Sequence, residues 1–269
     1  MSFQALGLSP ALTLAAAEFG FIDPTPIQAQ AIPAVLRGAD LLATAQTGSG
    51  KTAAFVLPVL QRQMQQPPHA ARRVRTLILV PTRELAAQVG EVTRQLAQHL
   101  TPRPKVAVAF GGVSINPQMM ALRGGADVMV GTPGRLLDLL AHNALRLDAV
   151  STLVLDEADR LLDLGFADEL QRLLAQLPAK RQNLFFSATF APAVQALASD
   201  LLHEPERIQV AEATESANGQ VPSQVVQRAI MVDANQRVPL LRHLIKEHQW
   251  ERVLVFVATQ YAAERVAAK

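Results

Sequence analysis

Short apolar runs alternate with longer amphipathic stretches over most of the chain. The runs are rich in valine, leucine and isoleucine, and they lie at residues 40–44, 76–80, 106–110, 128–130, 152–155, 183–186 and 207–210. Between two of them, Leu85, Val89, Val92 and Leu96 recur at spacings of four, three and four, which places them on one face of a helix. Strands that are apolar throughout, separated by amphipathic helices, predict a parallel sheet with helices on both faces. We therefore expect an α/β domain over residues 39–211, with a mostly parallel sheet of about seven strands.

Residues 1–38 precede this alternation and are predicted to form helices. Ser9 followed by Pro10 is a helix start signal, and Gly20 is a stop signal. A loop that is broken by two prolines follows, and a second helix is expected to begin near Ile27.

A polar, turn-rich segment at residues 212–223 interrupts the pattern and is expected to be a linker. Beyond it, residues 224–269 predict a strand at 225–232, a helix at 238–248, a strand at 253–257 and the start of another helix. Two strands cannot form an independent sheet, and a piece of this size is at the limit of what can bury its own core. We therefore expect the incomplete start of a second α/β domain.

Composition narrows the class of protein. With 269 residues, 49% of them hydrophobic and 18% charged, the chain is expected to fold around a sizeable core. The net charge is only +2, so an anionic partner would have to meet a local arginine cluster. The absence of cysteine excludes disulfides and thiolate metal sites, and the six histidines have no metal-ligand spacing. No secretory signal and no apolar run of 18 residues is found, which predicts a cytoplasmic protein without a membrane partner.

One glycine-rich stretch carries the strongest chemical signal, between the first apolar run and a helix-compatible segment. It reads Ala45-Gln46-Thr47-Gly48-Ser49-Gly50-Lys51-Thr52. A loop between a strand and a helix can turn its backbone N–H groups around phosphate oxygens, and its glycines permit the close approach. Lys51 can reach the β- and γ-phosphates, and the Thr52 hydroxyl can ligate Mg²⁺. The general pattern has glycine in place of Ala45, and the alternative is a Gly/Ser turn that happens to end in Lys-Thr.

A second signal is a pair of carboxylates, Asp156 and Glu157, at the end of the apolar run 152–155. In a nucleotide hydrolase such a strand end delivers one carboxylate toward Mg²⁺ and places the next to orient or deprotonate a water. The alternative is an acidic helix start that the helix dipole favours.

Three further junctions follow strands and offer backbone N–H groups, hydroxyls or arginines. They comprise Pro81, Thr82 and Arg83; Gly111 and Gly112; and Thr132, Pro133, Gly134 and Arg135. Because the carboxyl ends of parallel strands share one edge, these junctions are expected beside the phosphate loop. Several phosphate-type sites beside one nucleotide site indicate a polyanionic second ligand, a nucleic-acid backbone. Ordinary helix capping is the alternative for each junction by itself.

The tripeptide Ser187-Ala188-Thr189 also ends an apolar run. Its two hydroxyls are candidates to bond the carboxylate of Asp159 and so to couple the nucleotide site to its surroundings. Plain strand capping is the alternative.

Together these motifs resemble those of the DEAD-box RNA helicases. Residues 156–159 read Asp-Glu-Ala-Asp, 81–86 read Pro-Thr-Arg-Glu-Leu-Ala, 132–135 read Thr-Pro-Gly-Arg, and 187–189 read Ser-Ala-Thr. The phosphate loop matches the family's form, including its alanine, and residues 20–28 resemble the family's adenine-recognition segment. The opening of the chain, residues 3–66, is most similar to the bacterial RhlE-type subgroup. The resemblance implies a RecA-like P-loop fold and an ATP-dependent RNA helicase that hydrolyses ATP.

The resemblance also implies roles for individual residues. Gln28 would hydrogen-bond the adenine edge, and Phe21 would stack on its ring. Lys51 and Asp156 would act on the phosphates and, through water, on Mg²⁺, while Glu157 would position the attacking water. Asp159, Ser187 and Thr189 would couple hydrolysis to RNA engagement. The three junctions would grip the RNA sugar-phosphate backbone without sequence preference.

The resemblance implies partners as well. ATP and Mg²⁺ are the expected cofactors, and RNA is the expected macromolecular ligand. Ribosome-assembly or RNA-degradation machinery is the expected class of protein partner, and the full-length protein is expected to be a monomer.

The family's later motifs, including its arginine finger, are absent from the 269 residues. We therefore expect a truncated piece or gene fragment that binds ATP and, weakly, RNA, and that turns over poorly without unwinding, since a finger contributes roughly 10³–10⁵ in rate. Two rivals stay open at this point: an RNA clamp or annealing module that uses little ATP, and a P-loop enzyme that acts on a small molecule.

Overall fold

The computed structural model describes residues 2–46, 48–65, 72–210, 226 and 228–267. The chain divides into two compact units, residues 1–212 and 213–269. The first unit contains a seven-stranded sheet with the strand order β3-β4-β2-β5-β6-β1-β7. Every pairing in it is parallel, which confirms the predicted α/β class and its parallel sheet.

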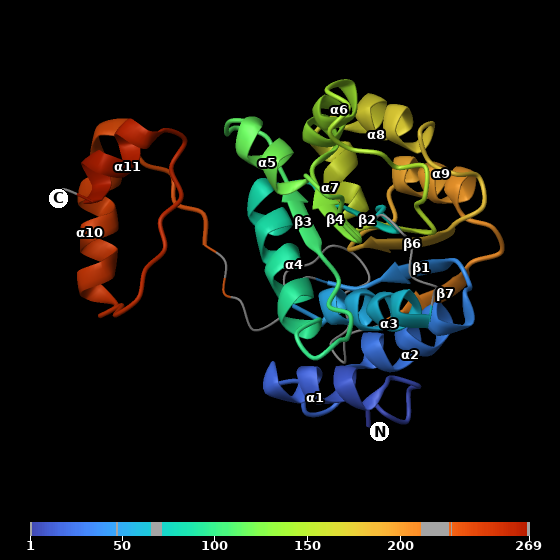
Figure 1. Cartoon of the computed structure of the whole chain (residues 1–269). Coiled ribbons are helices and arrows are strands. Elements are labelled where there is room, and N and C mark those ends of the chain that lie inside the picture. The colour runs from blue at the N-terminus through green and yellow to red at the C-terminus, as the bar shows by residue number, and fades with distance from the viewer. Residues whose placement is uncertain (1, 47, 66–71, 211–225, 227, 268–269) are drawn as a thin grey trace. The chain divides into compact units, whose positions relative to one another are not determined.

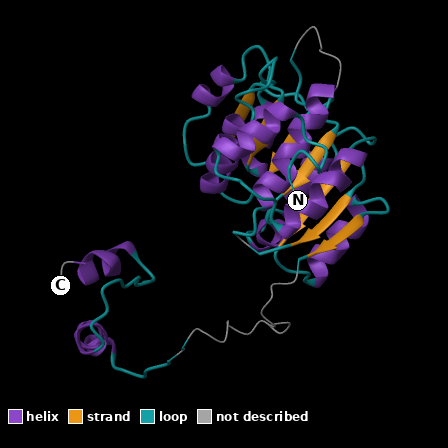
Figure 2. Ribbon diagram, turned by 90° about the horizontal axis from the view of Figure 1, so that it is seen from below, coloured by secondary structure: helices purple, strands orange, loops and turns teal. Residues whose placement is uncertain are grey.

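The strands are short and lie close to the predicted apolar runs. They are β1 (Leu41–Thr44), β2 (Thr76–Leu79), β3 (Val106–Ala109), β4 (Val128–Gly131), β5 (Thr152–Leu155), β6 (Gln182–Ser187) and β7 (Glu206–Gln209). The helices of this unit are α1 (Pro10–Glu18), α2 (Pro26–Arg37), α3 (Lys51–Gln65), α4 (Arg83–Leu96), α5 (Asn116–Ala121), α6 (Pro133–Ala141), α7 (Ala158–Asp163), α8 (Ala167–Leu174) and α9 (Pro192–Leu201). Figures 1 and 2 show helices on both sides of the strand layer.

The two faces of the sheet carry separate cores because successive strand residues point to opposite sides. Val154 of β5 packs in the cluster that contains the buried residues of α1 to α4. Its neighbours Leu153 and Leu155 pack in the other cluster, with buried residues of α6 to α9. Both faces of the central strands are therefore buried, which is the physical reason that these strands are apolar at successive positions, whereas the edge strand β7 carries exposed Arg207 and Gln209.

A buried polar contact holds the β1 and β6 ends of the sheet at the edge where the strands begin. The Asp40 carboxylate accepts hydrogen bonds from the backbone N–H of Asn183 at 2.7 Å and from its side-chain amide at 3.2 Å. It also accepts one from the backbone N–H of His203 at 2.9 Å. This carboxylate thus joins the start of β6 to the residue before β1 and to the segment after α9.

The second unit contains a 3₁₀ turn (Ala234–Gln236) and the helices α10 (Arg237–Glu247) and α11 (Gln260–Ala267). The two strands that we predicted here are wrong in the part that the structure describes, because residues 228–232 and 251–257 form no strand. The physical reason is the lack of a partner: the side chain of Phe256 is 88% exposed, and none of the described strands hydrogen-bonds to its segment. The predicted linker, residues 212–223, lies outside the described residues.

Candidate active site at the carboxyl edge of the sheet

The glycine-rich loop joins β1 to α3 and has the backbone shape that its glycines predict. Gly48 and Gly50 adopt φ values of +86° and +93°, in the left-handed region that favours glycine. A β-carbon on Gly50 would lie 2.6 Å from Nε2 of Gln28, so a side chain at this position would displace the Gln28 amide. Thr47, one of the predicted phosphate-binding residues, lies outside the described residues.

Two hydrogen bonds shape the described part of the loop. The Ser49 hydroxyl donates to the carbonyl of Gln46 at 2.8 Å, which closes a tight turn. Ala45, at the position where the general pattern has glycine, is buried, and its backbone N–H donates to the carbonyl of Ser187 at 3.1 Å. The glycine-rich loop is therefore tied directly to the end of β6.

Lys51 begins α3 and is 7% exposed. Its Nζ is buried and has no hydrogen-bond partner among the residues that the structure describes. A buried ammonium without hydrogen bonds is costly, and an anion bound in the loop would supply the missing acceptors. Thr52, the predicted magnesium ligand, follows in the first turn of the same helix.

Gln28 links the N-terminal helix α2 to this loop. Its side chain is 1% exposed; Oε1 accepts from the backbone N–H of Thr25 at 3.0 Å, and Nε2 donates to the carbonyl of Gly50 at 3.1 Å. Thr25 is the N-cap of α2, so the spacing of three residues to Gln28 is a capping-box signal that the sequence carried. Phe21, the other predicted adenine contact, is half-buried and lies against Phe19 with ring centroids 4.8 Å apart.

Asp156 lies beyond the end of β5 and is almost fully buried, at 3% exposure. Its burial raises the pKa of the carboxyl from 3.8 to about 6; the attraction of Lys51 opposes this shift, and the repulsion of Glu157 adds to it. The buried carboxylate of Asp156 and the buried ammonium of Lys51 therefore attract each other beside the glycine-rich loop.

Glu157 is held in an unusual backbone conformation. It is a non-glycine residue with φ +51° and ψ +53°, the left-handed region, where such residues cost energy. Its carboxylate accepts from Nη1 of Arg160 at 3.3 Å. Arg160 was not among the predicted site residues, although its i, i+3 spacing from Glu157 is the signal that identifies such pairs.

Asp159 contacts the Ser-Ala-Thr tripeptide as predicted, but through one of the two hydroxyls. Both the backbone N–H and the hydroxyl of Thr189 donate to Asp159 Oδ2 at 3.0 Å. The prediction that Ser187 also bonds Asp159 is wrong, because the Ser187 hydroxyl donates to the carbonyl of Thr189 at 2.8 Å. Ser187 is fully buried and so fixes the tripeptide, while Thr189 makes the contact.

The three predicted junctions meet at one place on this edge. A β-carbon on Gly112 would lie 3.9 Å from Nη1 of Arg83, and Arg135 Nη2 donates to the carbonyl of Val113 at 2.7 Å. The segment after Gly111 is therefore approached by arginines of both other junctions.

The arginines differ in what they offer a ligand. The side chain of Arg83 is 61% exposed and is paired only with its neighbour Glu84 among the described residues, whereas Arg135 is 8% exposed. Arg135 thus supports the glycine segment from within the fold. Its Nε and Nη1 are buried without hydrogen-bond partners in the described part of the chain, and Nε lies 3.6 Å from the carboxylate of Asp138. Thr132 and Pro133 are likewise buried, while Thr82 and Gly134 are half-buried.

The comparisons with known proteins agree with this arrangement. Residues 25–197 match the family model of the DEAD/DEAH box helicases, a span that holds every predicted site residue except Phe21. The "DEAD-box ATP-dependent RNA helicase 28" of Oryza sativa subsp. japonica is 41% identical over 266 residues, which cover 98% of this chain and 32% of that protein. The "ATP-dependent RNA helicase DeaD" of Mycobacterium tuberculosis is 39% identical over 268 residues, which cover 100% of this chain and 46% of that protein.

A solved structure shows the same fold. The crystal structure of the yeast DEAD-box splicing factor Prp28 matches with a TM-score of 0.71 and 35% identity, over 78% of this chain and 51% of that one. This chain spans about a third to a half of the length of the two relatives above. No helix in the described ranges is both long and apolar enough to cross a membrane. With 173 of its 269 residues, 25 to 197, inside the family model, the chain belongs to the DEAD/DEAH box helicase family.

Proposed function

We propose that this chain carries the ATP-binding half of an ATP-dependent RNA helicase, with RNA-stimulated ATP hydrolysis coupled to local unwinding in the whole protein. The observation that carries the proposal is the convergence on one sheet edge of a phosphate loop, a buried carboxylate and three arginine- or glycine-bearing junctions. In this proposal residues 1–38 recognise adenine, 39–211 bind ATP, and 224–269 begin the second helicase domain.

The phosphates of ATP would lie in the loop of residues 45–52, with the β- and γ-phosphate oxygens against Lys51. Nζ of Lys51 has no partner in the described part of the chain, and an anion in the loop would supply the acceptors that it lacks. Charge-assisted bonds of this kind are worth about 1.5–3 kcal/mol each.

The donor set fits Mg²⁺ bound together with the nucleotide. The described residues contain no cluster of three or more histidine, cysteine or carboxylate side chains, which agrees with an ion held mainly by phosphates and waters. Asp156 supplies a buried carboxylate, and Thr52 supplies a hydroxyl next to Lys51. When bound, the ion would neutralise charge on the β- and γ-phosphates.

Glu157 would orient the water that attacks the γ-phosphoryl group and accept its proton. The left-handed backbone at Glu157 sets the direction in which its side chain leaves the chain, and the bond from Arg160 restrains the carboxylate, which suits a positioned base. Arg160 is therefore a positioning residue in this mechanism.

RNA would bind along the junctions on the same edge. Arg83, exposed beside Gly112, is suited to a backbone phosphate, and the unblocked glycines allow the sugar-phosphate chain to approach closely. Arg135 contributes by holding the carbonyl of Val113, which fixes the glycine segment.

Coupling between the two ligands would run through Asp159 and the tripeptide 187–189. Thr189 contacts the DEAD segment, Ser187 fixes Thr189, and the Ser187 carbonyl accepts from Ala45 of the phosphate loop. A shift at the nucleotide site therefore has a continuous hydrogen-bonded route to the end of β6.

We further propose that the 269-residue chain by itself binds ATP and, weakly, RNA without unwinding, because it contains no arginine-finger motif. The bacterial RhlE-type subgroup, a cytoplasmic location, a monomeric full-length protein and partners in ribosome assembly or RNA degradation belong to the same proposal. They rest on the similarity of residues 3–66 to the RhlE-type subgroup and of the motifs to those of the DEAD-box helicases.

The proposal is tested by ATP turnover with and without single-stranded RNA. We expect slow turnover by this chain, and RNA-stimulated turnover when it is extended by the second helicase domain of a relative. Glu157→Gln should lower the stimulated rate by about 10²–10⁴ while ATP binding persists. Absence of RNA-stimulated hydrolysis in the extended protein would contradict the helicase proposal, and nucleotide-dependent RNA binding without hydrolysis would favour the RNA clamp.

Gln28 offers a test of adenine recognition. Gln28→Ala removes the bonds to Thr25 and Gly50 together with any bond to adenine, so we expect ATP affinity to fall about tenfold and the preference for ATP over GTP to shrink. Isothermal titration with both nucleotides measures this. Gln30→Ala, an exposed change on the same helix, is the control; equal affinity of the parent chain for ATP and GTP would exclude the adenine role.

A further inference from the structure

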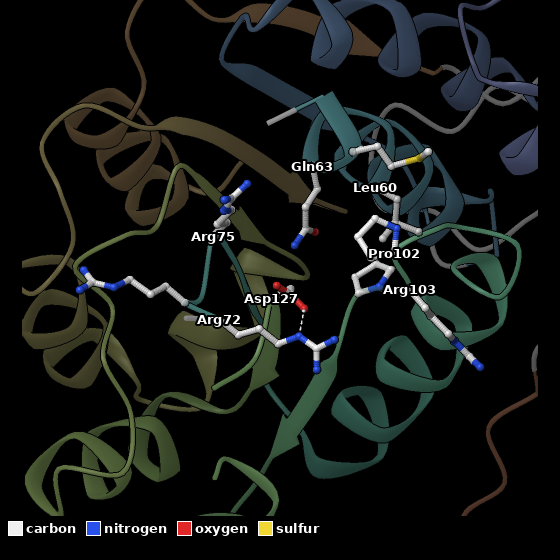
Figure 3. A pocket seen from close by; sticks show the side chains of 10 residues that line it. Leu60, Gln63, Arg72, Arg75, Pro102, Arg103 and Asp127 are labelled. Atoms are coloured by element: carbon white, nitrogen blue, oxygen red, sulfur yellow. Dashed lines mark ion pairs between the residues drawn. The ribbon is translucent and has the colours of Figure 1, made fainter. Parts of the chain in front are cut away.

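A second charged region lies at the opposite edge of the sheet, where the strands begin. A cavity of about 290 Å³ opens there (Figure 3). It is lined by Leu60, Gln63, Met64, Arg72, Arg73, Arg75, Pro102, Arg103, Pro104 and Asp127. Residues 72–75, 102–104 and 127 precede β2, β3 and β4, so the cavity lies at the edge opposite the phosphate loop, which follows β1.

Two more hollows continue this cavity along the surface. The second, of about 310 Å³, shares Arg72 and Arg73 with the first and adds Arg146. The third, of about 640 Å³, shares Leu122 and Asn143 with the second and adds Arg123, among others. Because they share lining residues, the three hollows adjoin one another, and we describe them together as one depression.

Positive charge gathers in this depression although the whole chain has a net charge of only +2. Its described lining holds six arginines, at 72, 73, 75, 103, 123 and 146, against the single carboxylate of Asp127. Asp127 is occupied within the protein, since it pairs with Arg72 at 3.3 Å and accepts from the backbone N–H of Lys105 at 2.7 Å. Arginines therefore outnumber carboxylates in this lining by six to one.

Five of these arginines are exposed, at 72, 73, 103, 123 and 146, and we call them the amino-edge basic surface. The contacts that hold them are weak. Arg73 pairs with Asp148 at 3.0 Å, but both side chains are about half exposed, and such pairs contribute about 0–1 kcal/mol. Arg103 donates to the carbonyl of Arg94 at 3.2 Å. A phosphate can therefore replace these partners at little cost.

The arrangement favours a polyanion over a small anion. The arginines are spread along three adjoining hollows instead of converging on one point, as a single phosphate would require.

We propose that the amino-edge basic surface binds the backbone of RNA, as a site separate from the helicase groove. The choice of RNA as the ligand rests on the proposed function, whereas the surface itself does not. Strands of four residues separate the two edges by about 13 Å at roughly 3.3 Å per residue, so the surface contacts neither the phosphate loop nor the junctions. It retains RNA whether or not ATP is bound.

The test is binding of a fluorescent single-stranded RNA to the full 269-residue chain without nucleotide, over a range of salt concentrations. The variant Arg73→Gln/Arg103→Gln/Arg146→Gln removes three exposed charges and one exposed ion pair. We expect at least a tenfold loss of affinity at low salt and a slope of log K against log salt that is shallower by about 2, because each lost phosphate contact contributes about 0.7.

A matched control is Arg37→Gln/Arg172→Gln/Arg207→Gln, which removes the same charge and one exposed ion pair, Arg37–Glu206. This control should bind RNA within about twofold of the parent if the RNA binds at the amino-edge basic surface. An equal loss in both triple variants, or no loss in the first, would overturn the proposal. Thermal unfolding of each variant verifies that the fold is kept.

Two further measurements distinguish RNA binding at this surface from RNA binding in the helicase groove and from binding of a small anion. Arg83→Gln changes the helicase junction only. If Arg83→Gln has no effect while the first triple variant has a large effect, this would contradict the proposed RNA groove and support this surface.

Competition with millimolar pyrophosphate at constant ionic strength tests for a small-anion site. If pyrophosphate removes the whole difference between parent and triple variant, the surface takes a small anion and the RNA proposal fails.

Discussion

Replacing Asp156 with asparagine is expected to stabilise the nucleotide-free protein at neutral pH and to slow ATP hydrolysis strongly. The carboxyl is 3% exposed, and burial raises its pKa from 3.8 to about 6. Between these two values the folded protein binds more protons than the unfolded chain, so its free energy of unfolding falls as the pH rises from about 4 to about 6. A shift of about two pKa units corresponds to about 3 kcal/mol.

Asparagine removes this cost while its side-chain oxygen can still accept from the backbone N–H of Glu157, as Asp156 Oδ1 does at 3.0 Å. We therefore expect Asp156→Asn to gain up to about 3 kcal/mol at pH 7.5 and little at pH 4. Urea unfolding at several pH values measures this. In the protein extended by a second helicase domain, hydrolysis should fall at least about a hundredfold, since metal-assisted charge stabilisation is worth several kcal/mol.

The control is Asp163→Asn, which neutralises an exposed carboxylate at the end of α7, the short helix that follows Asp156. It should leave the slope of stability against pH unchanged between pH 4 and 6. If Asp156→Asn kept the parent's slope in that range, another group would be responsible for it, and Asp156 would not be a site where stability is sacrificed for function.

The sheet was predictable from the sequence because burial on both faces leaves a direct mark. The central strands are apolar at successive positions, as at Leu153, Val154 and Leu155, and the helices between strands carry one apolar stripe. The strands predicted at 225–232 and 253–257 show the limit of this signal. An apolar run has strand propensity, but a strand exists only where another strand accepts its hydrogen bonds.

The site was predictable in its residue types and its location, but less so in its contacts. Motif spacing singled out the glycine-rich loop, the carboxylate pair and the junctions as candidates, and the parallel topology places these segments on one edge. Spacing did not indicate that Arg135 is buried under the glycine segment, or that Glu157 has left-handed backbone angles. Those features depend on tertiary packing.

The amino-edge basic surface left no sequence signal for a related reason. Its arginines come from segments before β2, β3 and β5 and after α5, far apart along the chain. Only the parallel sheet, which gathers the starts of its strands at one edge, brings these segments together. The overall charge of +2 conceals such a cluster because acidic residues elsewhere balance it.

Lys51→Met is expected to weaken ATP binding by about a hundredfold or more and to leave the fold intact. Methionine has similar length and suits a buried position, whereas the ammonium of Lys51 makes no hydrogen bond within the described part of the chain. Two charge-assisted bonds to phosphate oxygens, at about 1.5–3 kcal/mol each, account for the loss. Lys180→Met, at an exposed position, is the control for removal of a positive charge.

The same change should alter Asp156. The attraction of Lys51 lowers the pKa of this carboxyl against the effect of its burial, so without Lys51 the pKa should rise above its value of about 6. The fall in stability with pH should then extend to higher pH in Lys51→Met than in the parent, and it should vanish in the double variant Lys51→Met/Asp156→Asn. An unchanged pH range in Lys51→Met would mean that the two groups do not interact, and that the nucleotide site is not built around this buried pair of opposite charges.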